Sequence, residues 1–159
     1  MMTTPHGRLL ALDVGEKRIG VALSDESQTV ASAYTTLHAT PFTVFVQKLS
    51  KILAMESVVE IVVGLPLSLN GNEGPQAARI RAFIAALTPL VTQPITTCDE
   101  RYTSAEAERI MQEAGLRPEQ RKAKIDEVAA SIILQDVLNA RYIRQDTYTA
   151  YKEDEGDVV

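Results

Sequence analysis

The feature that most constrains this chain is a short apolar segment near its start that ends with a carboxylate. Residues 8–14 read RLLALDV, and a run of this length rich in branched apolar residues predicts a strand covered on both faces. Asp13 lies at the carboxyl end of this strand, where an ionised side chain is costly to bury without a partner. The chain is therefore expected to fold around a buried strand that carries an acid at its edge.

The segments after this strand predict an antiparallel start to the sheet. Residues 15–18 can turn the chain back into a second apolar run over 19–23, which forms a hairpin with the first strand. A third strand is expected over 32–37. The first third of the chain is therefore interpreted as a meander.

Helical and strand-like patterns alternate in the remainder of the chain. Helices are expected where apolar residues recur every three or four positions, and strands where apolar runs are short. This alternation favours crossover connections, so the fold class is α/β with a mixed sheet. The expected elements are a helix over 42–55, a strand over 58–63, a helix over 76–87, a strand over 94–98, a helix over 103–115 and a helix over 124–142.

Length and composition favour a single domain without disulfides. A chain of 159 residues that is 45% apolar can bury a core by itself. The single cysteine, Cys98, excludes an internal disulfide framework and is expected to pack in the core rather than act as a nucleophile. No apolar run is long enough to cross a bilayer, so we expect a cytoplasmic protein without a membrane partner.

The charge is distributed unevenly along the chain. The net charge is −5, and residues 146–159 hold five acids against one base, which leaves −1 on residues 1–145. We therefore expect a folded domain over 1–145 and an acidic, disordered tail over 146–159. Residues 117–124 carry a local charge of +3, which suits either contact with phosphate or a solvated connector.

Three acidic positions lie where strands or helices approach the expected core. Asp13 ends the first strand, and Asp99 with Glu100 ends the last strand. Asp126 shares one face of the final helix with Ala129 and its neighbours, so it is expected to face the sheet. Ligand sites of α/β sheets favour the carboxyl edge of the strands.

A shared carboxylate site would favour a divalent cation. Two carboxylates about 4 Å apart repel by roughly 4 kcal/mol at an effective dielectric of about 20, so a cluster needs cations or shared protons. Oxygen ligands without nearby Cys or His indicate Mg²⁺ or Mn²⁺, and two such ions can hydrolyse a phosphodiester. Taken singly, each acid also has an ordinary explanation as a turn residue, a strand end or a helix-dipole partner.

Four motifs of the chain resemble the YqgF family, also called RuvX. Their order and spacing agree with that family over roughly residues 8–141. They are Asp13 to Ala22 with Ser24-Asp25, Val63 to Leu67 with Asn70-Gly71 and Gly74, Asp99-Glu100-Arg101 with Thr103-Ser104, and Lys124-Ile125-Asp126 with Ala129-Ala130.

The resemblance implies a fold, a site and an activity. The fold is ribonuclease H-like, as in the resolvase RuvC, with a mixed five-stranded sheet, antiparallel in its first three strands and then parallel, and with helices on both faces. The acidic triad that binds metal and catalyses the reaction corresponds to Asp13, Glu100 and Asp126. The implied substrate is the 5′ end of the small-subunit (16S) ribosomal RNA precursor, within pre-ribosomal particles, or alternatively branched DNA cut by a homodimer.

Several residues around the triad are candidates for contact with nucleic acid. The glycine-containing loop can bring backbone N–H groups toward phosphate, although turn geometry explains its glycines equally well. Arg101 can contact nucleic acid or hold a triad acid. Arg79 and Arg81 are weaker candidates, because an exposed helix surface explains them. The candidates are Lys17, Arg18, Arg101, Arg121, Lys122 and Lys124 for nucleic acid, and Gly64, Asn70, Gly71 and Gly74 for the phosphate loop.

Two other classes of function remain open at this stage. The Asp-x-Gly start followed by a hairpin is similar to the first phosphate motif of actin-like ATPases, but those proteins bind nucleotide between two such domains and this chain has room for one. The second alternative is a monomeric or dimeric RNA-binding or ribosome-binding module without catalysis.

Overall fold

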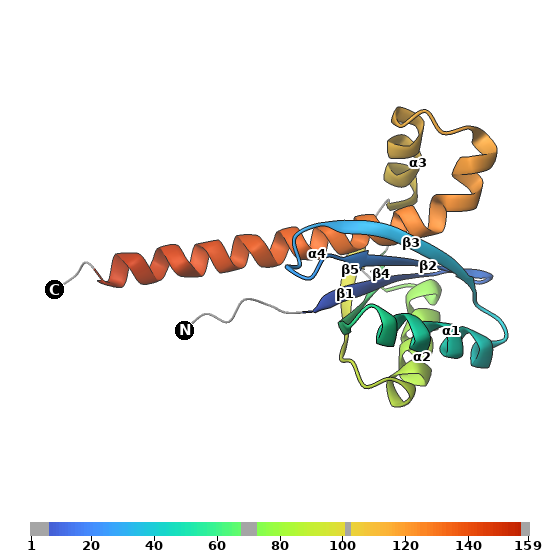
Figure 1. Ribbon diagram of the computed structural model, residues 1–159, viewed down its shortest axis with the longest axis horizontal. Coiled ribbons are helices and arrows are strands. Elements are labelled where there is room, and N and C mark those ends of the chain that lie inside the picture. The colour runs from blue at the N-terminus through green and yellow to red at the C-terminus, as the bar shows by residue number, and fades with distance from the viewer. Residues whose placement is uncertain (1–6, 68–72, 101–102, 157–159) are drawn as a thin grey trace.

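A five-stranded mixed sheet with the strand order β3-β2-β1-β4-β5 forms the centre of the computed structural model (Figure 1). β1 (Arg8–Val14), β2 (Arg18–Ser24) and β3 (Ala31–His38) are antiparallel neighbours. β4 (Val58–Pro66) pairs in parallel with β1, and β5 (Ile95–Glu100) pairs in parallel with β4. The predicted mixed sheet is confirmed. The structure describes residues 7–67, 73–100 and 103–156, and side chains in 7–67, 73–100 and 105–143.

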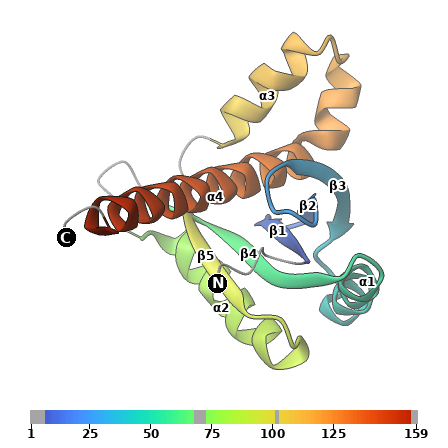
Figure 2. The ribbon, with the colours of Figure 1, turned by 60° about the vertical axis from the view of Figure 1, so that its left-hand side comes forward.

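Helices cover both faces of this sheet. α1 (Phe42–Met55) and α2 (Pro75–Leu87), which continues into the short η1 (Thr88–Leu90), lie on one face, and α4 (Pro118–Gly156) crosses the other (Figure 2). α3 (Thr103–Glu113) packs against the first turns of α4, and together they project from the sheet. The layered α/β arrangement expected from the sequence is therefore present.

The face toward α1 and α2 carries the larger side chains. Successive strand residues point to opposite faces, so alternate positions of each strand belong to the same core. Phe42, Phe45 and Phe83 pack together here, with ring centroids 5.6–6.2 Å apart. The strand residues of this core include Leu10, Leu12, Ile19, Val21, Ile61, Val63 and Leu65.

The face toward α4 is lined by small residues. Ala11, Ala22 and Ala130 are fully buried there. A Cβ added at Gly20 would overlap the backbone oxygen of Asp126. Because side-chain bulk sets the distance between packed elements, these small residues let α4 lie close to β1 and β2.

α4 is longer than the sequence pattern predicted. The apolar periodicity predicted a helix over 124–142, whereas α4 runs from Pro118 to Gly156. The extra turns at both ends consist largely of good helix formers without an apolar stripe, and periodicity detects only the part that packs on a core. Residues 146–156 continue α4, so the predicted separation of an acidic tail from residue 146 remains a prediction.

Two further side chains, Arg141 and Cys98, contribute to the packing between α4 and the sheet. The Arg141 guanidinium on α4 lies 2.6 and 3.0 Å from the carboxylate oxygens of Glu60 on β4, which ties the helix to the sheet. Cys98 packs against the core beneath α4, as expected, and burial raises the pKa of its thiol.

Within the described ranges, no helix has the length and hydropathy needed to cross a membrane.

We predict that Gly20→Ala destabilises the fold. The added methyl group meets helix backbone rather than a flexible side chain, so α4 must shift, and overpacking of this kind costs about 1–3 kcal/mol. Urea denaturation measures the free energy of unfolding. Gly74→Ser is the matched control, because a Cβ at Gly74 meets nothing within 4 Å. Equal stability of the two variants would contradict the close contact.

Candidate functional site

The three predicted acids lie at the α4 side of the sheet. Asp13 precedes the last residue of β1 and points to the same face as Leu9 and Ala11, which pack beneath α4. Glu100 is the last residue of β5, on the same face as Cys98. Asp126 is on α4 itself. Elements far apart in the sequence therefore bring these carboxylates to one region.

Two glycines, one on each strand beside β1, make room for this arrangement. Gly20 of β2 pairs with Asp13 and has the α4 backbone at Asp126 above it. On the other side, Val63 pairs with Leu12, so the next residues along these parallel strands are Gly64 and Asp13. A Cβ at Gly64 would overlap the carboxylate of Glu100. Both neighbours of Asp13 are thus left without side chains.

Burial and mutual repulsion disfavour the charged forms of two of these acids. Burial, and then the negative charge of Asp126, raises the pKa of Asp13 to about 6. Burial, followed by the charges of Asp13 and Asp136, raises the pKa of Glu100 to about 8. The carboxylates are therefore close enough to affect each other's charge, and among the residues that the structure describes no cation is paired with Asp13 or Glu100.

Among the described residues, Asp126 is the one of the three acids that is paired with a cationic side chain. Arg18 Nε of β2 donates a hydrogen bond to Asp126 Oδ2 at 2.9 Å. Among the described side chains, no group of three or more His, Cys, Asp and Glu residues is near enough to hold a metal ion. The structure therefore brings the three acids to one face, with Asp126 held by Arg18.

The predicted phosphate loop is only partly described. Gly64 lies inside β4, paired with Cys98, rather than in a loop, and its missing side chain gives space to Glu100. The interpretation of Gly64 as a phosphate-loop glycine is therefore replaced by this packing role. Gly74 is the N-cap of α2. Asn70 and Gly71 lie outside the described residues.

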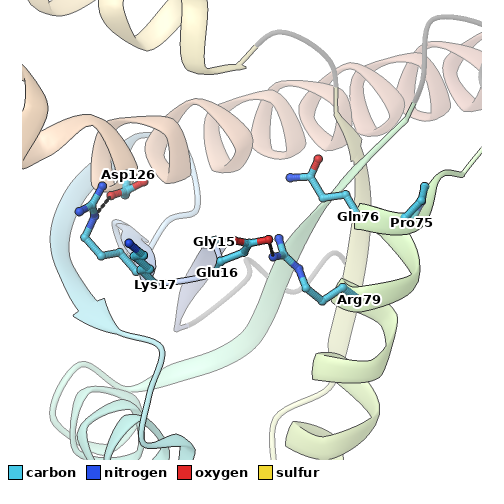
Figure 3. Close-up of a pocket in the computed structure, with 8 residues that line it drawn as sticks. Gly15, Glu16, Lys17, Pro75, Gln76, Arg79 and Asp126 are labelled. Carbon is cyan, nitrogen blue, oxygen red and sulfur yellow. Dashed lines mark hydrogen bonds and ion pairs between the residues drawn. The ribbon is translucent and has the colours of Figure 1, made fainter.

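A polar cavity of about 730 Å³ lies beside the acids (Figure 3). It is open to solvent and is bordered by the β1–β2 turn, the first turns of α2 and Asp126. The Arg79 guanidinium lies 2.9 Å from Glu16 Oε1 across this space. The residues that line it are Gly15, Glu16, Lys17, Arg18, Pro75, Gln76, Arg79 and Asp126.

The other predicted nucleic-acid contacts have different surroundings. Arg121 is only 20% exposed, donates a hydrogen bond to the Leu116 carbonyl at 2.9 Å and lies 3.7 Å from Glu108 of α3. These contacts join α3 to α4, so Arg121 has a structural partner on each side. Lys122 and Lys124 are exposed on α4. Arg101 and Tyr102 lie outside the described residues.

Two residues of the site carried weak signals in the sequence. Arg79 follows Pro75 by four positions, so it shares a face with the start of α2, a spacing that an exposed helix surface also explains. Gly20 interrupts an apolar strand, which indicates close approach of another backbone but does not say of which one.

Comparisons with known proteins agree on the family and the fold. The family model RuvX, described as Holliday junction resolvase, matches residues 7–140. A protein of Roseiflexus sp. (strain RS-1), described as a proposed pre-16S rRNA nuclease, is 49% identical over 140 residues, which are 88% of this chain and 99% of that protein. A protein of Chloroflexus aggregans with the same description is 46% identical over 133 residues, 84% of this chain and 94% of the relative.

A solved structure shares the fold at low sequence identity. RuvC of T. thermophilus, in complex with a Holliday junction substrate, is similar with a TM-score of 0.50 and 13% identity. The match covers 86% of this chain and 96% of RuvC. This likeness confirms the predicted ribonuclease H-like fold.

We predict that the metal-free protein loses stability as the pH rises from about 4 to 8. A carboxylate whose pKa is higher in the folded than in the unfolded state holds more protons when folded, so the free energy of unfolding falls between the two values. The window for Asp13 lies between 3.8 and about 6, and that for Glu100 between 4.5 and about 8. For Asp13 the cost above this window is about 3 kcal/mol.

Urea denaturation of wild type and Asp13→Asn in EDTA measures this cost. At pH 8 we expect the variant to be about 1–3 kcal/mol more stable than wild type, and at pH 4 the difference should vanish. Glu113→Gln, an exposed residue of α3, is the control for general charge effects. A variant less stable than wild type at pH 8 would contradict the raised pKa.

Proposed function

The chain belongs to the RuvX family, and from that premise we propose that it is a nuclease that hydrolyses phosphodiester bonds near the 5′ end of the 16S ribosomal RNA precursor. The curated relatives that it matches over most of its length are described as proposed pre-16S rRNA nucleases. A nuclease of this kind is a hydrolase. Family membership favours this activity over the actin-like ATPase considered from the sequence.

The main support for this proposal is the environment of Asp13 and Glu100. Asp13 and Glu100 are half-buried carboxylates that line one face of the sheet next to a cavity with basic side chains. Burial raises the pKa of both, and the charge of Asp126 raises that of Asp13 further, as the charge of Asp13 does for Glu100. A folded protein gains nothing in stability from buried acids that repel one another, and such perturbed groups gather at functional sites. Phosphodiester hydrolysis uses carboxylates together with nearby cationic groups for phosphate.

The chemistry of the three acids, rather than their spacing in the structure, suits a divalent cation. Asp13, Glu100 and Asp126 offer oxygen atoms only, which suits Mg²⁺ or Mn²⁺ rather than zinc. The raised pKa values of Asp13 and Glu100 show that burial and the neighbouring acids disfavour their charged forms, and a bound cation would offset this penalty. When bound, a divalent ion would lower the pKa of water and stabilise the leaving oxygen.

The protein's own residues supply orientation and charge. Gly64 lets the Glu100 carboxylate fold back toward Asp13, and Gly20 sets the height of Asp126 above the sheet. Arg18 holds Asp126 through a hydrogen bond and is available to phosphate when Asp126 takes another partner. Lys122 and Lys124 present charge on the surface of α4, where a longer substrate can contact them.

The cellular setting is part of the proposal. We place the protein in the cytoplasm, where it acts on the ribosomal RNA precursor in pre-ribosomal particles as a monomer or a homodimer. Residues 1–145 then form the nuclease domain, and residues 146–159 form an acidic tail outside the family match, which ends at residue 140.

A second candidate function is the resolution of branched DNA. The family description names Holliday junction resolvases, and the fold is that of RuvC. Paired cuts in a four-way junction require two active sites related by symmetry, hence a homodimer.

We predict that Asp13→Asn lowers cleavage of ribosomal RNA precursor by more than about 100-fold in Mg²⁺ or Mn²⁺, because it removes a carboxylate at the centre of the site. A gel assay with labelled precursor measures the rate. Mg²⁺ is further expected to raise the melting temperature of wild type more than that of the variant, which reports metal binding without activity. Undiminished cleavage by Asp13→Asn would overturn the assigned site.

We also predict a preference for ribosomal RNA precursor over a synthetic four-way DNA junction under identical metal conditions. Asp126→Asn should reduce cleavage of the preferred substrate, and size-exclusion chromatography gives the oligomeric state. Faster cleavage of the junction by a dimer would establish the second candidate. Binding of RNA without cleavage in either metal would indicate the non-catalytic module.

A further inference from the structure

We propose that Arg79 of α2 binds a backbone phosphate of the substrate next to the scissile position, and that Glu16 occupies this guanidinium until the substrate arrives. The inference rests on the proposed nuclease function for the identity of the ligand. It concerns the cavity beside the acids rather than the acids themselves (Figure 3). Arg79 was only a weak candidate from the sequence, because nothing there indicates what it faces.

The first argument is the charge of the cavity. Three cationic side chains line it, Lys17 and Arg18 from the β1–β2 turn and Arg79 from α2. Two acids line it as well, which leaves one positive charge in excess. Within the described part of the chain, the Lys17 ammonium has no hydrogen bond or ion pair, so the cavity holds a cation without a counter-charge. Such a space suits an anion.

The second argument is the pairing of the two arginines. Arg79 contacts Glu16, and Arg18 contacts Asp126, each at 2.9 Å. Both guanidinium groups therefore hold a carboxylate at the wall of the same cavity. A guanidinium can donate two parallel hydrogen bonds to a phosphate as it can to a carboxylate, so a substrate phosphate can replace either acid.

The third argument is the ease of this exchange. The Glu16 side chain is 81% exposed and that of Arg79 is 38% exposed. An exposed ion pair contributes little to stability, because water screens both charges and two long side chains must be ordered. Releasing Glu16 to solvent therefore costs little, whereas a phosphate in the cavity would meet its excess positive charge.

The location of the cavity determines which phosphate it can hold. Asp126 lines the cavity and also raises the pKa of Asp13, so the cavity adjoins the acidic site. Arg79 lies on the opposite wall from Asp126, on the first turns of α2. A strand cleaved at the acids would therefore place a neighbouring phosphate in the cavity. The start of α2, capped by Gly74 without a side-chain hydrogen bond, favours the same charge.

The test measures binding without cleavage. Fluorescence anisotropy in EDTA follows a fluorescein-labelled RNA that spans the 5′ end of 16S rRNA, over a range of salt concentrations. We expect Arg79→Gln to weaken binding about 3- to 10-fold and to reduce the salt slope by about 0.7, the share of one phosphate contact on a single strand. Arg79→Lys should recover part of the affinity, since lysine keeps the positive charge but lacks the planar guanidinium that donates two parallel hydrogen bonds.

A second measurement tests the role of Glu16, whose substitution should change the RNA affinity in the opposite direction. Glu16→Gln should tighten binding about 3-fold in the wild-type background, and most of this gain should disappear in the Arg79→Gln background. Arg109→Gln is the matched control, because Arg109 and Glu113 on α3 also form an exposed pair at 2.9 Å, away from the cavity. Circular dichroism verifies that each variant is folded.

Several results would overturn the subsite. They are absence of RNA binding by wild type, equal affinity of Arg79→Gln and Arg109→Gln, and an equal gain from Glu16→Gln with and without Arg79. A separate cleavage assay with Mg²⁺ or Mn²⁺ distinguishes this outcome from failure of the nuclease function. If binding follows the expected pattern and wild type does not cleave, the subsite stands and the nuclease proposal fails.

Discussion

The arrangement of the site depends on how closely α4 approaches the sheet. Packed helices keep a distance set by the side chains between them and their neighbours, and here several of those side chains are small, as at Ala11, Ala22 and Ala130, or absent, as at Gly20. The backbone at Asp126 lies directly over Gly20, the strand partner of Asp13. A larger residue at this one position would raise the helix and move Asp126 away from β1. The close packing of α4 on the sheet therefore also fixes the position of Asp126 in the site.

A second consequence of this packing is electrostatic. Close approach buries Asp13 and Glu100 near each other and raises the pKa of both, which costs stability that the rest of the fold supplies. Arg18 relieves only Asp126. The adjoining cavity has the opposite character, with Lys17, Arg18 and Arg79 on its walls. Acids that favour a cation thus lie beside bases that favour an anion, which is the pairing that a metal-dependent reaction on phosphate needs.

The sequence was a good guide where a pattern reflects packing. The apolar run at 8–14 and the helical periodicity over 42–55 correspond to β1 and α1 at the same bounds, because their residues fill the cores that the patterns record. It was a poor guide at the ends of α4, where the sequence continues the helix without an apolar stripe. Gly64 was assigned to a glycine-containing loop, although it lies within β4 beneath Glu100.

By itself, the sequence determined the α/β class, the order of the elements and, through the resemblance of its motifs, the family, and it predicted Glu100 rather than Asp99 as the site residue. These follow from local periodicity and from residue types at short spacing, which a linear chain displays directly. Only the tertiary structure decided that Gly20 and Gly64 flank Asp13, that Arg18 holds Asp126, and that Arg79 faces Glu16 across a cavity. Each of these contacts joins two separate elements of the fold, so it exists only after the sheet and its helices have packed.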